Sequence, residues 1–431
     1  MTRRLLAAAI GLSALVVATP GAAIVQEPTG NLLLLPDRVF DGERVHESWA
    51  VVVVGDTIVY AGPAADLVTT ADVRVHDLEG TTLMPGLIEG HSHLLLHPYD
   101  EVSWIDQVLR ESLAERVARA VVHVEATLRA GVTTVRDLGT EGAGFADVGI
   151  KAAIDKGVIP GPRMLIATKA LVTTGSYGPR GAPEHRFPKG AEVADGIDDL
   201  ARKTRDQIGR GADWIKVYAD YRWGPGGTAQ PTFTQRELDL IVEIAASSGR
   251  PVAAHAATAE GMRRAVLAGV RTIEHGDGGD ADVFALMAEH GVALCPTLAA
   301  GDAIMQYGGW NKAADPVPAR IRAKRASFTL ALDAGVEICF GGDVGVYPHG
   351  DNVRELELMH EYGMSRSAVL QAATAGNASI FGLERLGRIA VGKLADIVVV
   401  EGDPEQDLAA LYRVRMVLKN GEIVGEEKTW N

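Results

Sequence analysis

The long middle of the chain alternates short apolar runs with amphipathic stretches, and this alternation constrains the fold more than any other feature. The apolar runs predict strands at residues 83–88, 133–137, 163–169, 214–218, 251–254, 271–273, 293–296 and 337–340. The amphipathic stretches predict helices at residues 112–129, 193–209, 235–248, 259–268 and 320–334. Several of these helices end at a glycine just before the next strand. We therefore expect an α/β fold in which residues 86–386 form a (β/α)8 TIM barrel rather than an open doubly wound sheet.

Both ends of the chain carry a different, β-rich pattern. Strand-like runs occupy residues 32–35, 48–54 and 57–60 near the start and residues 397–400, 413–419 and 422–424 near the end. The pairs Gly55-Asp56 and Asn420-Gly421 are typical hairpin turns. We expect residues 24–85 and 387–431 to combine into one small β-sandwich domain.

The first residues have the features of a secretory signal peptide. Arg3 and Arg4 precede an apolar run over residues 5–17, and small residues follow at positions 21–23. We therefore expect residues 1–23 to be removed and the protein to be exported, periplasmic or secreted, by a route that the sequence leaves open. No later apolar run reaches membrane-spanning length, so no membrane anchor is expected.

The charge balance is acidic. The formal net charge is −14, and loss of the leader leaves 40 basic against 56 acidic residues. Such a surface disfavours nucleic acids and anionic membranes as partners. The two cysteines, Cys295 and Cys339, lie in apolar runs and are expected to be buried core thiols, with a disulfide open in an oxidising compartment.

The first predicted strand of the barrel ends in two histidines, His91 and His93. Side chains two residues apart on a strand point to the same face, so both imidazoles can approach one metal ion. Such a pair alone is a weak signal, because histidines are common in solvated loops.

Further polar residues lie on or at the ends of other predicted strands, where barrel enzymes place their chemistry. They are Lys216 on the fourth strand, His255 after the fifth, His275 after the sixth and Asp343 after the eighth. Each has an ordinary structural interpretation, such as a snorkelling lysine, a satisfied core histidine or a helix cap. Their joint occurrence, together with the histidine pair, favours a metal site.

Six segments spread along the chain resemble the amidohydrolase superfamily, in the branch of imidazolonepropionase-like proteins, Xaa-Pro dipeptidases and amidases that hydrolyse ochratoxin. They are LMPGLIEGHSHL, GVTTVRDLG, GADWIKVYAD, AAHAATAEGMRRAVLAGVRTIEHG, GGDVGVYPHGDN and GRIAVGKLADIVVVEGDP. The resemblance implies two divalent metal ions, with zinc as the expected metal and cobalt, nickel or manganese as alternatives. It assigns the first ion to His91, His93 and Asp343, the second to His255 and His275, and the bridge to a carboxylated Lys216.

The same resemblance implies a mechanism of metal-assisted hydrolysis. A lysine reacts with carbon dioxide only as the neutral amine, and burial near cations lowers its pKa. Water held between two ions is activated as the nucleophile. Asp343 is expected to act as general base and then as proton donor to the leaving nitrogen, while the second ion polarises the scissile carbonyl.

The residues that would contact the substrate are chosen by their position near these strand ends. Tyr218, Tyr221 and Arg222 follow the fourth strand, where Arg222 is expected either to bind a substrate carboxylate or to lie in a surface loop. Relatives often carry a Gly-His pair in the loop where this chain has Tyr177, and a tyrosine there would favour an aromatic or bulky acyl group. His349 is expected to reach the substrate, and His97 to line the pocket or support a metal ligand. The other histidines are expected to be surface or structural residues: His46, His76, His123, His185, His290 and His360.

The resulting functional prediction is a binuclear metal-dependent amidohydrolase. Its expected substrate is a small carboxylate-bearing molecule, either a dipeptide or an N-acyl amino acid such as ochratoxin A. The alternatives are a Xaa-Pro dipeptidase proper, a cyclic-amide hydrolase or deaminase, and a secreted metal-binding protein without turnover. Deaminases of the superfamily usually keep one metal and lack the bridging lysine, so Lys216 argues against them. The resemblance also implies a homo-oligomer, with an octamer among the expected sizes.

Overall fold

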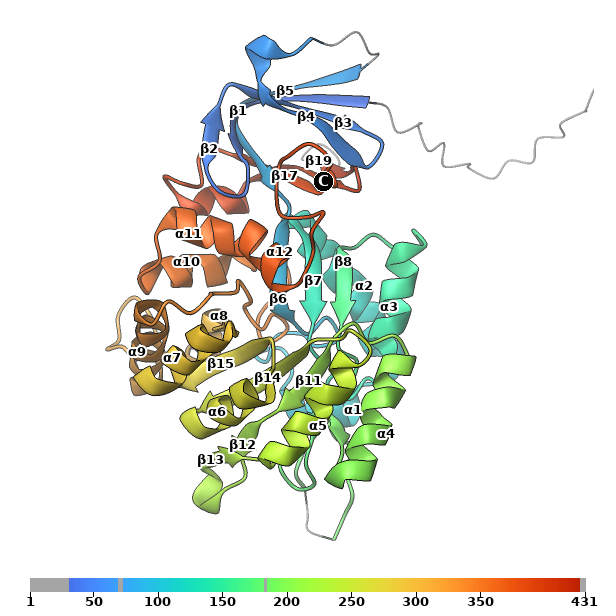
Figure 1. The fold of residues 1–431 in the computed structure, drawn as a ribbon, viewed down its shortest axis with the longest axis vertical. Helices are drawn as coiled ribbons and strands as arrows, with labels where there is room; N and C mark the ends of the chain where they lie inside the picture. The colour runs from blue at the N-terminus through green and yellow to red at the C-terminus, as the bar shows by residue number, and fades with distance from the viewer. Residues whose placement is uncertain (1–30, 69–72, 182–183, 427–431) are drawn as a thin grey trace, which may run out of the picture.

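The computed structural model describes residues 31–68, 73–181 and 184–426. The predicted signal peptide, residues 1–23, lies outside these ranges, so export stays a prediction. In Figure 1 a β-sheet built from both ends of the chain caps an α/β body in which helices surround central strands. Among the described residues, no helix combines the length and the hydropathy needed to cross a membrane.

The terminal sheet has eight strands. They are β1 (Asn31–Phe40), β2 (Val45–Glu47), β3 (Trp49–Val54), β4 (Thr57–Pro63), β5 (Val73–Pro85), β17 (Ile397–Glu401), β18 (Val414–Lys419) and β19 (Glu422–Glu426). Their order is β19-β18-β17-β5-β1-β3-β4, with β2 on β1, so β5 joins the two ends by pairing antiparallel with β17. Buried Leu34, Val51, Leu83 and Val399 belong to one apolar cluster of this sheet. A sandwich of two packed layers stays a prediction.

The central strands run parallel in two sheets. One sheet has the order β6-β7-β8, and the other has the order β10-β9-β11-β14-β15-β16. Their bounds are β6 (Leu87–Ser92), β7 (Val132–Asp137), β8 (Arg163–Ile166), β9 (Leu171–Val172), β10 (Glu192–Val193), β11 (Ile215–Tyr218), β14 (Val252–Thr258), β15 (Thr272–Gly278) and β16 (Ala293–Cys295). A short antiparallel pair, β12 (Asp220–Arg222) and β13 (Ala229–Pro231), follows β11.

Backbone hydrogen bonds also join strands of the three-stranded sheet to segments adjoining β11 and β16 of the other sheet. The Asp213 amide donates to Ile166 O at the end of β8 (2.8 Å), and the Gly90 amide of β6 donates to Phe340 O (2.8 Å). Residues 337–340 were predicted to be a strand, and this prediction is wrong, because only Ile338 forms an isolated parallel bridge, to Leu294. The fold is α/β, and its closure into an eight-stranded barrel stays a prediction.

Twelve α-helices pack around the strands of the described chain (Figure 1). They are α1 (Trp104–Arg110), α2 (Leu113–Arg129), α3 (Ala146–Asp155), α4 (Gly196–Gly209), α5 (Gln235–Ala246), α6 (Ala259–Ala268), α7 (Ala281–His290), α8 (Leu298–Tyr307), α9 (Ala319–Asp333), α10 (Val353–Glu361), α11 (Arg366–Gln371) and α12 (Asn377–Ile380). The five predicted helices are confirmed with small shifts at their ends. Side-chain caps fix several starts, including a capping box of Thr234 and Glu237 on α5.

The two cysteines form a disulfide, so the prediction of two buried thiols is wrong. The parallel bridge between Leu294 and Ile338 sets Cys295 opposite Cys339, with their Cα atoms 4.5 Å apart. This distance lies within the range that a disulfide spans. The bond therefore covalently joins β16 to the neighbouring segment 337–340.

Candidate active site

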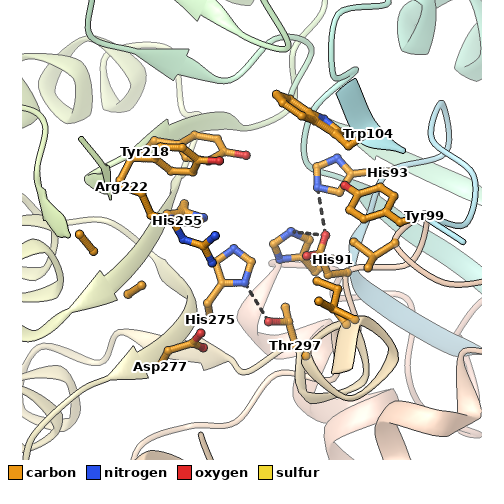
Figure 2. Close-up of a pocket in the computed structure, with 18 of the residues that line it drawn as sticks. His91, His93, Tyr99, Trp104, Tyr218, Arg222, His255, His275, Asp277 and Thr297 are labelled. Atoms are coloured by element: carbon orange, nitrogen blue, oxygen red, sulfur yellow. Dashed lines mark hydrogen bonds and ion pairs between the residues drawn. The ribbon is translucent and has the colours of Figure 1, made fainter. Parts of the chain in front are cut away.

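Four histidines gather where the central strands end (Figure 2), and Asp343 lines the same pocket. His91 lies on β6 and His93 follows that strand, while His255 and His275 lie on β14 and β15. Oδ1 of Asp343 is 3.2 Å from Nε2 of His93 and 3.5 Å from Nε2 of His91. The ring centroids of His255 and His275 are 4.4 Å apart, and those of His91 and His275 are 5.2 Å apart.

The donor atoms of three of these residues are close enough to share one ion. His91, His275 and Asp343 each offer a ligand atom, and these atoms lie within 4.8 Å of one another. His93 contacts Asp343, and His255 packs beside His275, so both border the same space. Lys216, on β11, is 1% exposed. The structure thus brings the four histidines and Asp343 to one place.

Three of the histidines have one ring nitrogen fixed by a hydrogen bond. Nδ1 of His91 binds Glu274 Oε2 (2.7 Å), Nδ1 of His93 binds the Gly139 carbonyl (2.8 Å), and Nδ1 of His275 binds Thr297 Oγ1 (2.8 Å). Metal-binding histidines typically use their second nitrogen in this way, which sets the tautomer and the ring orientation. Each Nε2 is therefore the nitrogen available to a ligand.

Glu274 is itself held by a buried arginine, Arg136 of β7. Nη2 of Arg136 donates to Glu274 Oε1 (2.9 Å), Nε donates to the Gly90 carbonyl (2.7 Å), and both side chains are fully buried. The guanidinium also lies 4.4 Å from the ring centroids of Trp214 and of Phe381. Successive hydrogen bonds thus connect Arg136 of β7 through Glu274 of β15 to His91 of β6, and these three residues form a hydrogen-bonded relay.

Burial sets the protonation state of most of these histidines. It lowers the pKa of His91 to about 4, that of His255 to about 3, and that of His275 well below its usual value. These imidazoles are therefore neutral at pH 7, which is the form that binds metals. Burial also opposes charge on His93, but the Asp343 carboxylate outweighs it and raises the pKa of His93 to about 9.

Several residues around the site have left-handed backbone conformations, which are costly for side chains other than glycine. They are Glu141 (φ 47°), His275 (φ 74°), Thr297 (φ 53°) and Asp343 (φ 65°). Strained conformations of this kind cluster at functional sites, and they persist only where the surrounding packing holds the backbone in place.

The histidines open into a pocket of about 310 Å³. The predicted substrate residues Tyr177, Tyr218, Tyr221 and Arg222 line it. Figure 2 shows Tyr218 and Arg222 on the side of His255, and Trp104 and Tyr99 on the side of His93. Other lining residues that we did not predict are Tyr99, Trp104, Glu141, Asp277, Thr297, Arg320 and Lys324. A pattern search based on strand ends misses them because most belong to loops and helices.

Two predicted pocket histidines do not line the pocket. Nδ1 of His97 binds Glu101 (3.1 Å) and Nε2 binds Glu111 (2.8 Å). Nε2 of His349 binds the Leu96 carbonyl (2.9 Å), and its ring stacks on His123 at 4.2 Å. The predictions that His97 lines the pocket and that His349 reaches the substrate are therefore not supported by this geometry.

The residues present fit divalent metal ions. Imidazole nitrogens and a carboxylate are ligands that zinc and its neighbours accept. The fixed Nδ1 atoms direct three Nε2 atoms inward. Asp343 supplies an ionised carboxylate. Burial raises its pKa, but His91, which is protonated at the low pH where Asp343 titrates, and His93 outweigh burial and lower the pKa of Asp343 to about 2.

Comparison with known proteins agrees with this geometry. Residues 82–424 match the Amidohydrolase family, and the chain belongs to this family. It is a hydrolase of the kind that acts on carbon–nitrogen bonds.

Individual relatives are moderately similar. The chain is 29% identical to an ochratoxinase of Aspergillus niger over 426 residues, covering 89% of this chain and 83% of that protein. It is 26% identical to an imidazolonepropionase of Micrococcus luteus, covering 87% and 92% respectively. A solved structure of a Xaa-Pro dipeptidase with methionine in its active site superposes with a TM-score of 0.81 at 30% identity, covering 92% of this chain and all of the other.

Proposed function

We propose that the protein is a binuclear metal-dependent amidohydrolase that cleaves an amide or peptide bond in a small substrate with a free carboxylate. The observation that carries this proposal is the convergence of four histidines and Asp343 on one pocket that also contains Arg222. The similarity to an ochratoxinase and to a Xaa-Pro dipeptidase supports an N-acyl amino acid or a dipeptide as the substrate.

The metal ligands proposed are His91, His93 and Asp343 for one ion and His255 and His275 for the other. A divalent ion at such a site supplies an activated water and a Lewis acid for the scissile carbonyl. The support from the described residues is the inward direction of the Nε2 atoms and the neutral state of three imidazoles.

Lys216 is proposed to be carboxylated and to bridge the two ions. Burial lowers the pKa of its amine to about 8, although Glu274 opposes this shift, so a substantial fraction is neutral and able to react with carbon dioxide near pH 8. Within the described part of the chain, its Nζ makes no hydrogen bond or salt bridge, and the ring of Tyr218 is centred 5.9 Å away.

Asp343 is proposed to move the proton of the reaction. Its carboxylate contacts the Nε2 atoms of His91 and His93, so it lies among the proposed ligands and within reach of a bound water. Oδ of Asp343 would accept a proton from the nucleophile and return it to the leaving nitrogen. Arg222, whose side chain has no salt bridge among the described residues, would bind the substrate carboxylate.

The test is a substrate panel with metal-reconstituted protein. It contains carboxyl-terminated dipeptides, N-acyl amino acids including ochratoxin A, and a cyclic amide, with release of amine as the measurement. Turnover of a linear carboxylate-bearing amide supports the proposal. Turnover of the cyclic amide alone, or of nothing in the panel, contradicts it.

Hydrolysis of a cyclic amide is the second candidate, because the chain is 26% identical to an imidazolonepropionase.

Metal analysis separates the remaining alternatives. Two ions per chain with turnover favour the amidase, one ion favours a deaminase, and two ions without turnover favour a binding protein.

Three further features belong to this proposal. We propose that the central strands close into a (β/α)8 barrel, supported by the hydrogen bonds that connect both sheets. Removal of a signal peptide and export are proposed from the first residues of the sequence. Assembly into a homo-oligomer, with zinc as the bound metal, is proposed from the family resemblance.

A further inference from the structure

A buried carboxylate, Glu141, lies on the pocket wall outside the proposed ligand set. It follows β7, lines the pocket and is 3% exposed. Oε2 accepts hydrogen bonds from Trp104 Nε1 (2.9 Å) and Tyr177 Oη (2.8 Å), and Oε1 accepts only a long one from Tyr218 Oη (3.4 Å). All three donors are neutral, and one oxygen is left with spare hydrogen-bonding capacity.

No cation forms a salt bridge with this carboxylate anywhere in the described ranges. The nearby Arg116 donates instead to the backbone carbonyls of Leu95, Thr140 and Glu141. An acidic side chain is rarely this buried unless it is paired, because removing its charge from water is costly. Arg116 and His93 thus attract Glu141 electrostatically, but neither forms a salt bridge with its carboxylate.

A strained backbone conformation holds Glu141 in this position. Glu141 has a left-handed conformation (φ 47°), and Arg116 Nη1 holds its carbonyl at 2.7 Å. A Cβ atom added to Gly190 would come within 2.8 Å of Glu141 Oε2, so the loop can close over Trp104 and Tyr177 only because residue 190 is glycine. Packing thus maintains a strained residue that aims a carboxylate into the pocket, as is typical of functional positions.

Oε1 of Glu141 also lies beside the proposed metal centre. A Cβ atom added to Gly139 would be 3.6 Å from both Glu141 Oε1 and His93 Cε1. In a dipeptide the ammonium nitrogen is two bonds from the scissile carbonyl carbon. A group that binds this ammonium must therefore lie next to the reacting centre, as Glu141 does.

The other charges of the pocket wall are either satisfied or positive. Asp277 pairs with Lys324, and Asp220 accepts hydrogen bonds from the amides of Ala257 and Thr258. Arg222 and Arg320 line the pocket and make no salt bridge with any described residue. Among the described residues, the pocket-lining charges without a salt bridge therefore include the Glu141 carboxylate near His93 and the two arginines elsewhere on the wall.

We propose that Glu141 binds a protonated amine on the acyl side of the substrate, so that the enzyme prefers substrates with a free amino group, such as dipeptides, over neutral N-acyl amino acids. This inference rests on the proposed function. The substrate ammonium forms the direct ion pair that Oε1 lacks, and Arg222 takes the carboxylate of the leaving amino acid, so a zwitterionic dipeptide matches both charges.

The test compares each dipeptide of the panel with its N-acetyl derivative, in wild type and in Glu141→Gln. Glutamine keeps the shape and an acceptor for Trp104 and Tyr177 but removes the charge. We expect wild type to favour the free amine, and Glu141→Gln to lower kcat/KM by about 10- to 100-fold for the free dipeptide with little change for the acetylated one. Glu141→Asp should retain part of the preference. Glu125→Gln, an exposed carboxylate paired with Arg129, is the matched control and should match wild type.

The possible failures are distinguishable. An equal loss for both substrates in Glu141→Gln assigns Glu141 a structural role and overturns the inference alone. A wild-type preference for the acetylated substrates also overturns it, and this measurement stands even where Glu141→Gln does not fold. Absence of turnover of both substrate forms overturns the proposed function, and the inference with it.

Discussion

Two groups of histidines lie close together in this protein and differ in what their nitrogens contact. The pocket histidines are His91, His93, His255 and His275, and three of them have Nδ1 fixed while Nε2 points to a shared space. The outer histidines are His97, His123 and His349, whose hydrogen bonds go to Glu101, Glu111 and the backbone carbonyls of Leu94 and Leu96.

Both groups are well packed, so burial alone does not separate a candidate metal ligand from a structural histidine. The difference lies in the partners. Three pocket histidines have one nitrogen held by a hydrogen bond and the other directed at an acidic residue and a cavity, whereas His97 has both nitrogens occupied by carboxylates outside the pocket. This comparison leads to variants that should affect the two groups differently.

The largest expected effect is a loss of kcat when Asp343, which contacts two pocket histidines, is replaced. Asp343→Asn keeps an oxygen ligand but removes the base that accepts and returns the proton. We expect kcat to fall by about 10²- to 10⁴-fold, with metal content by elemental analysis close to that of wild type. A kcat near the wild-type value would rule out this role.

The second-largest effect is expected on stability and metal binding, when the relay of Arg136, Glu274 and His91 is broken. Arg136→Met leaves Glu274 buried without its charged partner, and loss of one member of a buried pair costs about 3–5 kcal/mol of unfolding free energy. We expect a lower urea midpoint together with weaker metal binding. Arg202→Met, in an exposed pair with Asp199, is the control and should change neither quantity. Unchanged metal affinity in folded Arg136→Met would show that the relay stabilises the fold without orienting His91.

A smaller effect is expected at Thr297, which anchors Nδ1 of His275. Thr297→Val keeps the β-branched shape but removes the hydroxyl, so the imidazole loses its fixed orientation. We expect metal affinity, measured by competition with a chromophoric chelator, to fall by about 10- to 100-fold. Thr329→Val, on the exposed face of α9, should leave the affinity unchanged.

The smallest effect on activity is expected among the outer histidines. His97→Gln loses a hydrogen bond to the largely buried Glu111 and one to the exposed Glu101, and should cost about 1–3 kcal/mol of unfolding free energy. Metal content and kcat of the folded protein should match wild type, because His97 does not line the pocket. A loss of bound metal in His97→Gln would remove the distinction between the two groups.

The sequence by itself located seven of the eight predicted central strands and the five predicted helices, together with several of the residues that line the pocket. Hydrophobic periodicity reports which residues face a core, and polar residues at the ends of parallel strands must meet at one edge. For this reason the sequence could single out His91, His93, His255, His275 and Asp343, which all line one pocket.

Only the tertiary structure decided which partner each polar atom takes. Glu274 and His91 are 183 residues apart, and Cys295 meets Cys339 because β16 lies beside residues 337–340. The same packing turned His97 and His349 away from the pocket and placed Glu141 in it. Local patterns fix the backbone period, whereas the hydrogen bonds of a side chain depend on segments that only the fold brings into contact.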